Sequence, residues 1–557
     1  MTKRKHVLRV IPLGGLDEIG KNMTVLEYGD DLVVVDAGLM FPDVELPGVD
    51  LVLPDYSYIL KRKNKLRGIV ITHGHEDHTG ALPYLLRDLG EPVPVLGTKL
   101  TCGLIEGKLA EFNIKKPKLR EVKPGMHVTL GCFGFDFIPT NHSIPDSVAL
   151  LIRTPVGNVL HTGDFKFDQT PIDGRGTDFA ALTKAGKDGV LLLLSDSTGA
   201  ESKGYTRPER EIGTTLHHII EDAPQRVIVA SFSSHIHRVQ MVCDAAVSNG
   251  RKVVVTGRSM IKNTGIAREL GFLNIAPENI VDAFDAGDLP PDKIVILSTG
   301  SQGEPLSALA RMANGDHRTV SIEASDTVII SASPVPGNEK AVSRVINRLS
   351  KAGAAVYHKG VADVHVSGHA SAEELKLMLT MVKPRYFMPV HGETRHLMAH
   401  ARLAKGIGMT DEDIFVMEIG ECLEIDEQGR ARLTGKVAEA GVVYVDGLHV
   451  GDVNDIVLRD RQQLSSDGIA TIVVALNGRT HAVTGEPELI VRGLPVAESA
   501  EMMDQARARI RKALNRMQKE GVTDHGVIQH AVRDALSQYL WESLRRRPMI
   551  IPVIMEV

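Results

Sequence analysis

The most constraining feature of this 557-residue chain is a cluster of metal-ligand side chains after one predicted strand. The apolar run GIVIT is typical of a strand, and the apolar run GALPYLL beyond the cluster favours a helix. The turn between them carries His73, His75, Asp77 and His78. Imidazole and carboxylate groups are common ligands of divalent ions, so the spacing predicts two neighbouring metal positions, the first pair facing one and the second pair the other. A polar loop with histidines clustered by chance is the alternative.

Three residues elsewhere in the chain complete this cluster. His142, Asp164 and His391 each lie in a turn directly after an apolar, strand-like run. A single histidine or aspartate in such a turn more often has a structural role than a metal-binding one. Together with the first cluster they supply enough imidazole and carboxylate for two divalent ions, with Asp164 as the shared ligand.

Composition limits the class of partner. The 64 Lys+Arg against 70 Asp+Glu give a formal charge of -6, so a nucleic-acid partner requires a locally basic groove or metal ions. Aromatic residues make up only 4%, which argues against a platform that stacks many successive bases.

The cysteines and the apolar runs indicate the compartment. Cys102, Cys132, Cys243 and Cys422 lie far apart, which predicts neither a disulfide framework nor a thiolate zinc site. No run of apolar residues is long enough to cross a membrane. We therefore expect a cytoplasmic protein without a membrane segment.

The pattern of strands and helices predicts an α/β protein of three domains. Strands with polar ends fill the first two hundred residues, strand and helix then alternate as in a parallel sheet, and the polar strand end returns in PRYFMPVHGE. The predicted parts are a split first domain of residues 1–205 and 365–450, an inserted parallel α/β domain of residues 206–364, a linker of residues 451–465 and a small C-terminal α/β domain of residues 466–557.

The motifs together resemble one family. H-x-H-x-D-H with the later His, Asp and His resembles the metallo-β-lactamase superfamily, whose fold is an αββα sandwich with metals at one edge. Asp196 in LSDST, with His369 and His391, is similar to the motifs of the β-CASP branch, which acts on nucleic acids. With LGGLDEIGKN, GRSM, LSTGSQGEP and HVSGHAS, the chain resembles bacterial ribonuclease J nearly from end to end.

This resemblance implies a role for each ligand. One ion takes His73, His75 and His142, the other takes Asp77, His78 and His391, and Asp164 is shared. Two divalent ions activate water and neutralise charge on a phosphate. Either Zn²⁺ or Mn²⁺ suits these ligands, and the sequence does not decide between them.

Two further residues are expected to act beside the metals. His369 is the candidate acid that protonates the leaving 3′ oxygen, and Asp196 is expected to orient it. A strand-end cap is the alternative for Asp196. Asp36, at the end of LVVVDAG, is expected to support a metal ligand or to form a turn.

The RNA is expected to contact the turn formed by His365, Val366, Ser367, Gly368 and His369, which we predict to end a strand. Its backbone N–H groups, hydroxyl and imidazoles suit a phosphate, and the family places the terminal nucleotide there. Further phosphate candidates, for which helix capping is the alternative, are Ser233, Ser234, Arg238, Ser331 and Ser333.

A third ion is a weaker prediction. Gly48 and Asp50 offer oxygen ligands, and the resemblance adds Asp446, a set that suits a structural Ca²⁺. Exposed, solvated acids are the alternative. The basic segment 506–519 is expected to be a helix with a solvated face or a dimer contact, rather than one that touches RNA.

The function that these observations predict is a metal-dependent ribonuclease active in RNA decay and in the maturation of rRNA and other RNA. The resemblance implies 5′-to-3′ exonuclease activity on single-stranded RNA with a 5′ monophosphate, endonuclease activity from the same site, and a homodimer or tetramer. A hydrolase of small esters or thioesters and a non-catalytic RNA-binding scaffold are the alternatives. The large insertion argues against the first, and the complete ligand set argues against the second.

Overall fold

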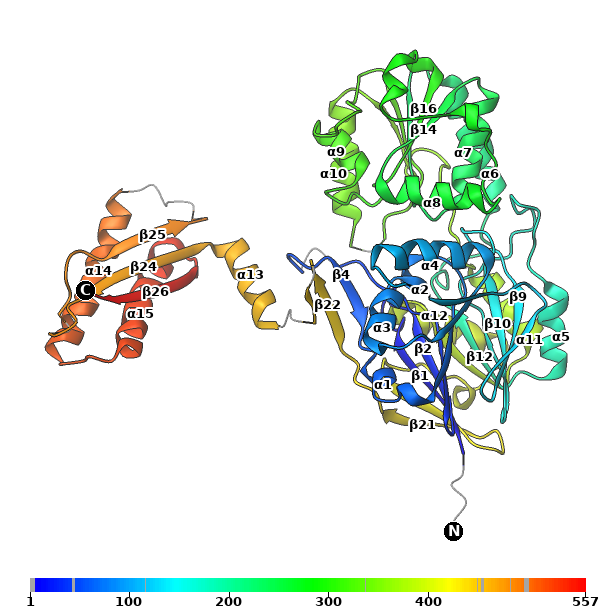
Figure 1. Cartoon of the computed structure of the whole chain (residues 1–557), viewed down its shortest axis with the longest axis horizontal. Helices are drawn as coiled ribbons and strands as arrows, with labels where there is room; N and C mark the ends of the chain where they lie inside the picture. The colour runs from blue at the N-terminus through cyan, green and yellow to red at the C-terminus, as the bar shows by residue number, and fades with distance from the viewer. Residues whose placement is uncertain are drawn as a thin grey trace, which may run out of the picture. The chain divides into compact units, whose positions relative to one another are not determined.

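The computed structural model describes residues 6–42, 46–115, 117–335, 337–447, 449–451, 455–480, 482–494 and 500–557. The chain divides into two compact units, one of Met1–Phe41 and Val52–Val443 and one of Pro42–Leu51 and Tyr444–Val557. Figure 1 follows the chain from blue to red.

Two sheets face each other in the first unit. One has eight strands in the order β21-β20-β1-β2-β3-β5-β6-β7, and the other has six in the order β19-β12-β11-β10-β9-β8. The strands of the first sheet are β1 (Leu8–Gly14), β2 (Met23–Tyr28), β3 (Asp31–Val35), β5 (Leu66–Val70), β6 (Pro94–Gly97), β7 (Lys118–Glu121), β20 (Glu421–Ile425) and β21 (Ala431–Lys436). Those of the second are β8 (His127–Leu130), β9 (Phe133–Pro139), β10 (Val148–Thr154), β11 (Gly157–His161), β12 (Leu192–Asp196) and β19 (Tyr386–Val390).

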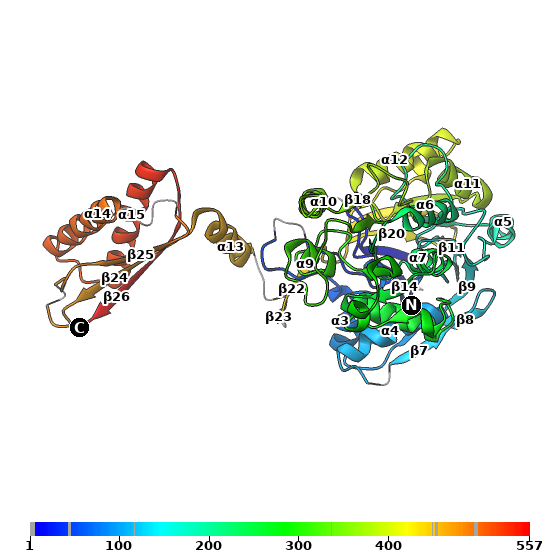
Figure 2. The ribbon, with the colours of Figure 1, turned by 90° about the horizontal axis from the view of Figure 1, so that it is seen from above.

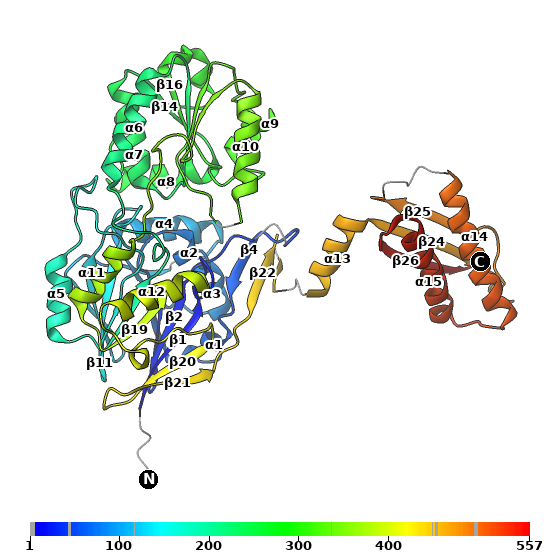
Figure 3. The same cartoon turned by 180° about the vertical axis from the view of Figure 1, so that it is seen from behind.

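An apolar core joins the two sheets, and helices cover their outer faces. Val33 of the first sheet and Leu150 and Leu192 of the second belong to one buried cluster. The outer face of the six-stranded sheet packs against α5 (Phe179–Asp188), α11 (Ala372–Val382) and α12 (Thr394–Gly406), as Figure 3 shows. Helices α1 (Ser57–Leu60), α2 (Glu76–Thr79), α3 (Leu82–Leu89) and α4 (Lys99–Glu111) lie beside the eight-stranded sheet (Figure 1). The predicted αββα sandwich is therefore confirmed.

The insertion contains a third sheet, in which all pairs are parallel, with the order β15-β14-β16-β13-β17-β18. Its strands are β13 (Val227–Ala230), β14 (Lys252–Val255), β15 (Ile280–Val281), β16 (Ile294–Ser298), β17 (Thr327–Ile330) and β18 (Ala355–Tyr357). Its helices are α6 (Glu209–Asp222), α7 (Ile236–Ser248), α8 (Arg258–Glu269), α9 (Ala308–Asn314) and α10 (Glu339–Lys351). Helices α6 and α7 cover one face and α9 and α10 the other (Figures 1 and 2). Burial on both faces explains why these strands read as nearly continuous apolar runs, and the predicted parallel α/β insertion is confirmed.

Short elements complete the first unit and begin the second. The 3-10 helices are η1 (Lys63–Lys65), η2 (Pro277–Asn279), η3 (Asp285–Asp288), η4 (Pro291–Lys293) and η5 (Asp411–Asp413). A three-stranded sheet has the order β23-β22-β4, with β4 (Leu51–Pro54), β22 (Val442–Asp446) and β23 (His449–Val450).

The second unit is a small α/β fold. Its sheet has the order β25-β24-β26, and its elements are α13 (Asp455–Asp467), β24 (Ile469–Leu476), β25 (Glu488–Arg492), α14 (Ala500–Lys519), α15 (His525–Leu544) and β26 (Met549–Glu556). The basic segment 506–519 lies within α14, whose buried residues recur mostly every fourth position. The predicted linker includes residues 452–454, which lie outside the described residues, and from Asp455 onward the chain is helical. The sequence pattern did not predict this helix, because Leu458 is the one buried residue of α13 and the segment therefore shows little apolar periodicity.

One sequence prediction about local structure was wrong. The turn from His365 to His369 does not end a strand, because it lies in an irregular segment between β18 and α11. Among the described residues, no helix is both long and apolar enough to cross a membrane.

Candidate metal centre

The topology brings the predicted ligands to one edge of the sandwich. β11, β12 and β19 are adjacent and parallel, and Asp164, Asp196 and His391 lie at or just beyond their carboxyl ends. β9 runs in the same direction as β11 because each is antiparallel to β10, so His142 reaches the same edge. In the facing sheet, β5 ends just before His73. Parallel strands end together, which is why such edges collect functional side chains.

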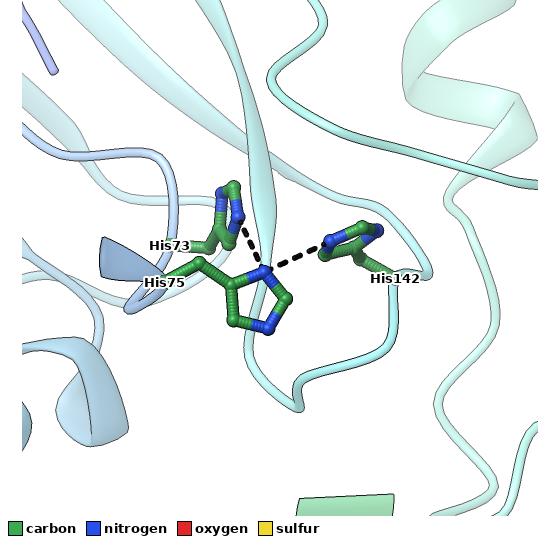
Figure 4. Close-up of side chains that lie close together, drawn as sticks. All are labelled: His73, His75 and His142. Atoms are coloured by element: carbon green, nitrogen blue, oxygen red, sulfur yellow. Dashed lines mark hydrogen bonds between the residues drawn. The ribbon is translucent and has the colours of Figure 1, made fainter. Parts of the chain in front are cut away.

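His73, His75 and His142 form the first ligand set (Figure 4). The Nδ1 atom of His75 lies 3.2 Å from Nε2 of His73 and 3.1 Å from Nε2 of His142. Bonds of about 2.0–2.1 Å around a tetrahedral zinc ion place neighbouring ligand atoms about 3.3 Å apart. The three nitrogens therefore fit a single ion.

Hydrogen bonds on the far side of two rings orient this set. His142 Nδ1 donates to the carbonyl oxygen of Gly368 at 2.8 Å, because a carbonyl only accepts, and its Nε2 is left as the ligand atom. His73 Nδ1 lies 3.1 Å from the hydroxyl of Thr72. A Cβ atom at Gly368 would lie 2.7 Å from the ring of His142, so glycine is required for this close approach.

Asp77, His78, Asp164 and His391 form the second set. His78 Nε2 lies 3.3 Å from Asp164 Oδ2, and His391 Nε2 lies 3.4 Å from Asp77 Oδ2. His391 Nε2 is buried and has no hydrogen-bond partner among the described residues, although a buried polar atom normally has one. A divalent ion bound by this set would supply the missing partner, so this set also fits a metal.

Asp164 lies between the two sets. Its Oδ2 atom is 3.8 Å from Nε2 of His73 and 3.7 Å from Nε2 of His142, in addition to its contact with His78. Its Oδ1 atom is 3.0 Å from His391 Nδ1. This position suits a carboxylate shared by two ions.

Burial and charge set the protonation of these groups. Burial lowers the pKa of His75 to about 4 and holds the pKa values of His73 and His142 well below the ordinary range. Their imidazoles are neutral at pH 7 and offer lone pairs to a metal. Although burial opposes it, the carboxylate of Asp164 and other neighbouring acids raise the pKa of His78 well above its ordinary value.

Asp36 supports the second set. Its Oδ2 atom accepts from His78 Nδ1 at 2.8 Å, which aims Nε2 of that ring at the metal edge. Its Oδ1 atom accepts from the backbone N–H of Thr72 at 2.8 Å. These contacts agree with the prediction that Asp36 supports a metal ligand. They also tie the ends of β3 and β5 together.

Asp196 and His369 lie together beside this centre. His369 Nδ1 donates to Asp196 Oδ2 at 2.8 Å and lies 3.9 Å from Asp164 Oδ2. Burial lowers the pKa of His369, but the Asp196 carboxylate outweighs this effect, and the pKa is raised above its ordinary value. Asp164, Asp196, His369 and His391 also lie close enough to form a third potential ligand set.

The phosphate candidates separate into buried and open residues. Arg238 is fully buried and donates to Glu209, and the Ser331 hydroxyl donates to the carbonyl of Val364, so both are structural as placed. Ser367 is exposed, and its hydroxyl accepts from the N–H of His369 at 3.1 Å. Ser233 and Ser234 are half-buried. The buried hydroxyl of Ser333 and the buried Nδ1 of His365 have no hydrogen-bond partner among the described residues.

The calcium prediction does not fit the geometry of the second unit. Arg461 pairs with Asp446 and also donates to the carbonyl of Pro47 at 3.2 Å, beside Gly48. Asp50 accepts from the N–H of Gly447 at 2.7 Å. Calcium takes six to eight oxygen ligands, whereas here a guanidinium already supplies the positive charge.

Sequence reasoning missed several residues that support the centre. Lys166 and Glu209 are buried charges close to it, and neither lies in a motif of ligand spacing. The signal in the sequence for Lys166 was its charge between Phe165 and Phe167, whereas Glu209 has a charged neighbour and gave no such signal. Thr198 and Asn22 were also missed, and their side chains lie 3.3 Å from His391 Nδ1 and 3.2 Å from His78 Nε2.

Four family models match the chain. The metallo-beta-lactamase superfamily matches residues 16–217, and the ribonuclease J beta-CASP domain matches residues 224–349. The Zn-dependent metallo-hydrolase RNA specificity domain matches residues 353–417, and the ribonuclease J C-terminal domain matches residues 456–557.

Several known proteins are similar to this chain over nearly its whole length. Ribonuclease J of Mycolicibacterium smegmatis is 44% identical over 550 residues, covering 99% of this chain and 97% of that protein. Ribonuclease J2 of Bacillus subtilis is 42% identical over 557 residues and covers 100% of both. Ribonuclease J of Thermus thermophilus is 43% identical, covering 99% of this chain and 95% of that protein. A crystal structure of a protein of unknown function from Enterococcus faecalis covers 75% of this chain with a TM-score of 0.53 at 15% identity, which shows the fold alone.

Two candidate ligand sets lie at the edge of an αββα sandwich, and a parallel α/β domain is inserted between the two parts of that sandwich in the sequence. These features define a metallo-hydrolase of the metallo-β-lactamase superfamily with a β-CASP domain. The similarity over the full length is more specific than this class. The chain belongs to the ribonuclease J family. It is a metal-dependent ribonuclease that hydrolyses and binds RNA.

Proposed function

We propose that one active site carries out 5′-to-3′ exonuclease and endonuclease cleavage of single-stranded RNA. The observation that supports this most is the placement of Ser367 and His369 on one turn. Ser367 is exposed, while His369 is joined to the metal edge through Asp196. A phosphate held by the first residue would therefore lie close to the chemistry of the second. The full ligand sets favour this function over a non-catalytic scaffold, and the family favours it over a hydrolase of small esters.

The bound ions would occupy the two ligand sets. The first set is rich in imidazole and the second combines imidazole with carboxylate, so we propose Zn²⁺ or Mn²⁺ as the ions used. When bound, two such ions lower the pKa of water to near neutrality and offset charge on the scissile phosphate. Burial keeps the imidazoles of His73, His75 and His142 unprotonated by lowering their pKa values, and Asp36 and Gly368 fix the directions of two rings.

His369 protonates the leaving 3′ oxygen in this proposal. Its Nδ1–H is committed to Asp196, so Nε2 is the atom that can give a proton to the substrate. The Asp196 carboxylate favours the protonated ring and limits its rotation. Asp196 is thus a positioning residue and His369 a catalytic one.

The 5′ phosphate binds at the 365–369 turn in this proposal. Ser367 is exposed there. The Nδ1 atom of His365 and the hydroxyl of Ser333 have no hydrogen-bond partner among the described residues, so each could donate a hydrogen bond to a phosphate oxygen. A pocket sized for one phosphate should accept a monophosphate and reject a triphosphate through steric conflict and unpaired charge.

End-labelled RNAs test the 5′-end assignment. We expect 5′-monophosphorylated RNA to be degraded processively, and triphosphorylated RNA of the same sequence to be degraded slowly from its end but still cut internally. Ser367→Ala should reduce the preference for the monophosphate about 10- to 100-fold, since a hydrogen bond to a charged group contributes about 1.5–3 kcal/mol. Ser350→Ala, at an exposed position of α10, is the control. Equal exonuclease rates on the two RNAs would refute the assignment.

We also propose that the second unit supports a homodimer, with a tetramer as a further assembly. Its helices cover one face of the sheet, while the other face presents apolar side chains. Thr471 pairs in register with Ile490 and Ile551 on either side, so all three share a face. Ile490 and Ile551 are 44% and 41% exposed. Apolar side chains gathered on one exposed face are typical of association surfaces.

Light scattering tests this assembly. Ile551→Asp should lower the molar mass towards that of a monomer, because a buried carboxylate opposes association, and deleting residues 466–557 should do the same. Val527→Asp is the matched control, because Val527 is 49% exposed but lies on α15. An oligomer that survives both the Ile551 substitution and the deletion contradicts the proposal.

The cytoplasm is the compartment we propose for this ribonuclease. All four cysteines are free in the structure, as expected in a reducing environment. The substrates there include rRNA precursors and RNA undergoing decay.

A further inference from the structure

Four charged side chains lie buried next to the metal edge, outside both ligand sets. Lys166 and Asp168 follow the shared ligand Asp164 in the chain, Glu209 begins α6, and Arg238 lies in α7. Arg238 is 0%, Lys166 and Glu209 are 1%, and Asp168 is 6% exposed. Charged residues are almost never fully buried unless they are paired, so this set needs a specific explanation.

The four charges compensate one another through Glu209. Its Oε1 atom accepts from Lys166 Nζ at 3.3 Å, and its Oε2 atom accepts from Arg238 Nη2 at 2.8 Å. Its backbone N–H donates to Asp168 Oδ2 at 2.9 Å. Burial raises the pKa of Glu209, but Arg238, His235 and Lys166 outweigh this and hold it well below the ordinary range. The group is therefore two cations and two carboxylates.

Lys166 and Arg238 also donate hydrogen bonds to backbone carbonyls of the segment that carries His369. Lys166 Nζ donates to the carbonyl of Ser367 at 3.2 Å. Arg238 Nη1 donates to the carbonyl of Val364 at 2.9 Å, and Ser331 donates to the same oxygen at 2.6 Å. Lys166 belongs to the sandwich, whereas Arg238 belongs to the insertion.

Side chains hold the remainder of this turn as well. Gly368 accepts from His142, which is a ligand of the first set, and His369 accepts from the hydroxyl of Thr206 at 2.7 Å. The carbonyls of an irregular segment have no ladder of strand or helix partners, so their positions depend on these donors. The shape of the turn is thus determined by residues far away in the sequence.

We propose that Lys166, Glu209 and Arg238 are positioning residues of the ribonuclease, which together set the backbone of residues 364–369 relative to the metals. The proposal rests on the proposed roles of Ser367 and His369 for its effect on cleavage. Glu209 is the central residue, because it is the single carboxylate that holds both cations. A shift of the turn by even 1 Å would misplace His369, which typically lowers a rate about 100-fold.

Hydrogen exchange tests the structural part of the proposal without reference to cleavage. Glu209→Gln keeps the size of the side chain but removes the charge that holds the two cations. Backbone amides of residues 364–371 should then exchange faster than in the unchanged protein, because local opening becomes easier. Lys166→Met, which removes the donor to Ser367, should have the same effect.

Asp326→Asn is the matched control for these variants. Asp326 is a buried carboxylate that accepts two hydrogen bonds from Arg226, but it lies just before β17, at the opposite end of that strand from Ser331. It should lower the stability of the insertion while leaving exchange in the turn unchanged. Ser331→Ala removes one donor to Val364 without removing a buried charge, and it serves if a charge variant does not fold.

Two substrates test the catalytic part. RNA needs protonation of its leaving oxygen, whereas a nitrophenyl phosphodiester releases a stable phenolate and does not. Glu209→Gln should lower kcat on RNA about 10- to 100-fold but lower it much less on the nitrophenyl ester, with metal content unchanged. His369→Ala, measured beside it, should show the same selectivity.

These outcomes separate the two ideas. Equal losses on both substrates for His369→Ala would count against the acid assigned to His369, and the exchange data would still decide whether the three residues hold the turn. Selectivity in His369→Ala but not in Glu209→Gln overturns the positioning role in cleavage. Unchanged exchange of residues 364–371 in both Glu209→Gln and Lys166→Met, or in Ser331→Ala if those do not fold, overturns the proposal as a whole.

Discussion

Asp164→Ala should abolish RNA cleavage, with a loss well beyond the 10- to 100-fold that residues supporting a metal ligand typically contribute. Asp164 Oδ2 lies within 3.8 Å of ligand nitrogens of both sets. In the proposed two-ion centre, removing it would take one carboxylate from both ions, and their mutual repulsion would be less compensated. The measurement is cleavage of end-labelled RNA after the protein has been stripped with a chelator and reloaded with Zn²⁺ or Mn²⁺.

The control and the metal content make this result interpretable. Asp188→Ala removes an exposed carboxylate at the end of α5 and should retain full activity. Metal analysis should find fewer than two ions bound to Asp164→Ala, and circular dichroism should show that the fold is kept. More than a tenth of the original activity after reloading would contradict a shared ligand at this position. His75→Ala, which removes the nitrogen common to both short contacts of the first set, should be equally inactive.

His369→Ala should reduce exonuclease and endonuclease cleavage in parallel, each by about 10²- to 10⁴-fold, the usual contribution of general acid catalysis. Both modes must protonate the same leaving oxygen, and His369 is joined to Asp196 at the metal edge for either substrate orientation. Bound metal should be unchanged, because all residues of the first two sets remain. The measurement compares a 5′-monophosphorylated linear RNA with a circular RNA, which has no end and reports internal cleavage alone.

Asp196→Asn separates orientation from proton transfer. The amide can still contact the ring, but it lacks the negative charge that raises the pKa of His369. We expect an intermediate loss in both modes, smaller than that of His369→Ala. A His369 variant that keeps internal cleavage of the circular RNA while losing the exonuclease would assign the residue to end recognition and not to the leaving group.

The two kinds of variant at the 365–369 turn should differ in character. Ser367→Ala is expected to change the preference between 5′ ends, whereas His369→Ala changes the rate on every RNA. This contrast follows from exposure, because Ser367 is open to solvent while His369 contacts buried Asp196.

Local sequence was sufficient to predict the general fold and the candidate metal ligands that the structure brings together. The four residues of the first cluster are close in the chain, and each distant ligand follows an apolar strand run, so short-range patterns located all of them. The alternation of strand and helix likewise predicted a parallel insertion, which the sheet with its five parallel pairings confirms. Such patterns arise from burial and from strand periodicity, which are local properties.

Other features depended on contacts that no local pattern records. The turn at 365–369 was predicted to end a strand but is irregular, because the carbonyls of Ser367 and of the preceding Val364 accept from Lys166 and Arg238 instead of from a neighbouring strand. Helix α13 lies largely within the segment predicted as a linker, where the sequence shows little helical periodicity because Leu458 is the one buried residue of this helix. The calcium prediction considered oxygen ligands alone and did not foresee that Arg461 would fill the position.

The sequence by itself determined the candidate metal ligands, because these residues have the right chemistry and follow strands whose ends meet at one edge. Only the tertiary structure decided which groups hold those ligands and the 365–369 turn in place. Glu209 and Lys166 are buried and paired across the junction of two domains. A charge buried in a protein is stable only with its partner, and that partner is selected by the fold and not by its distance along the chain.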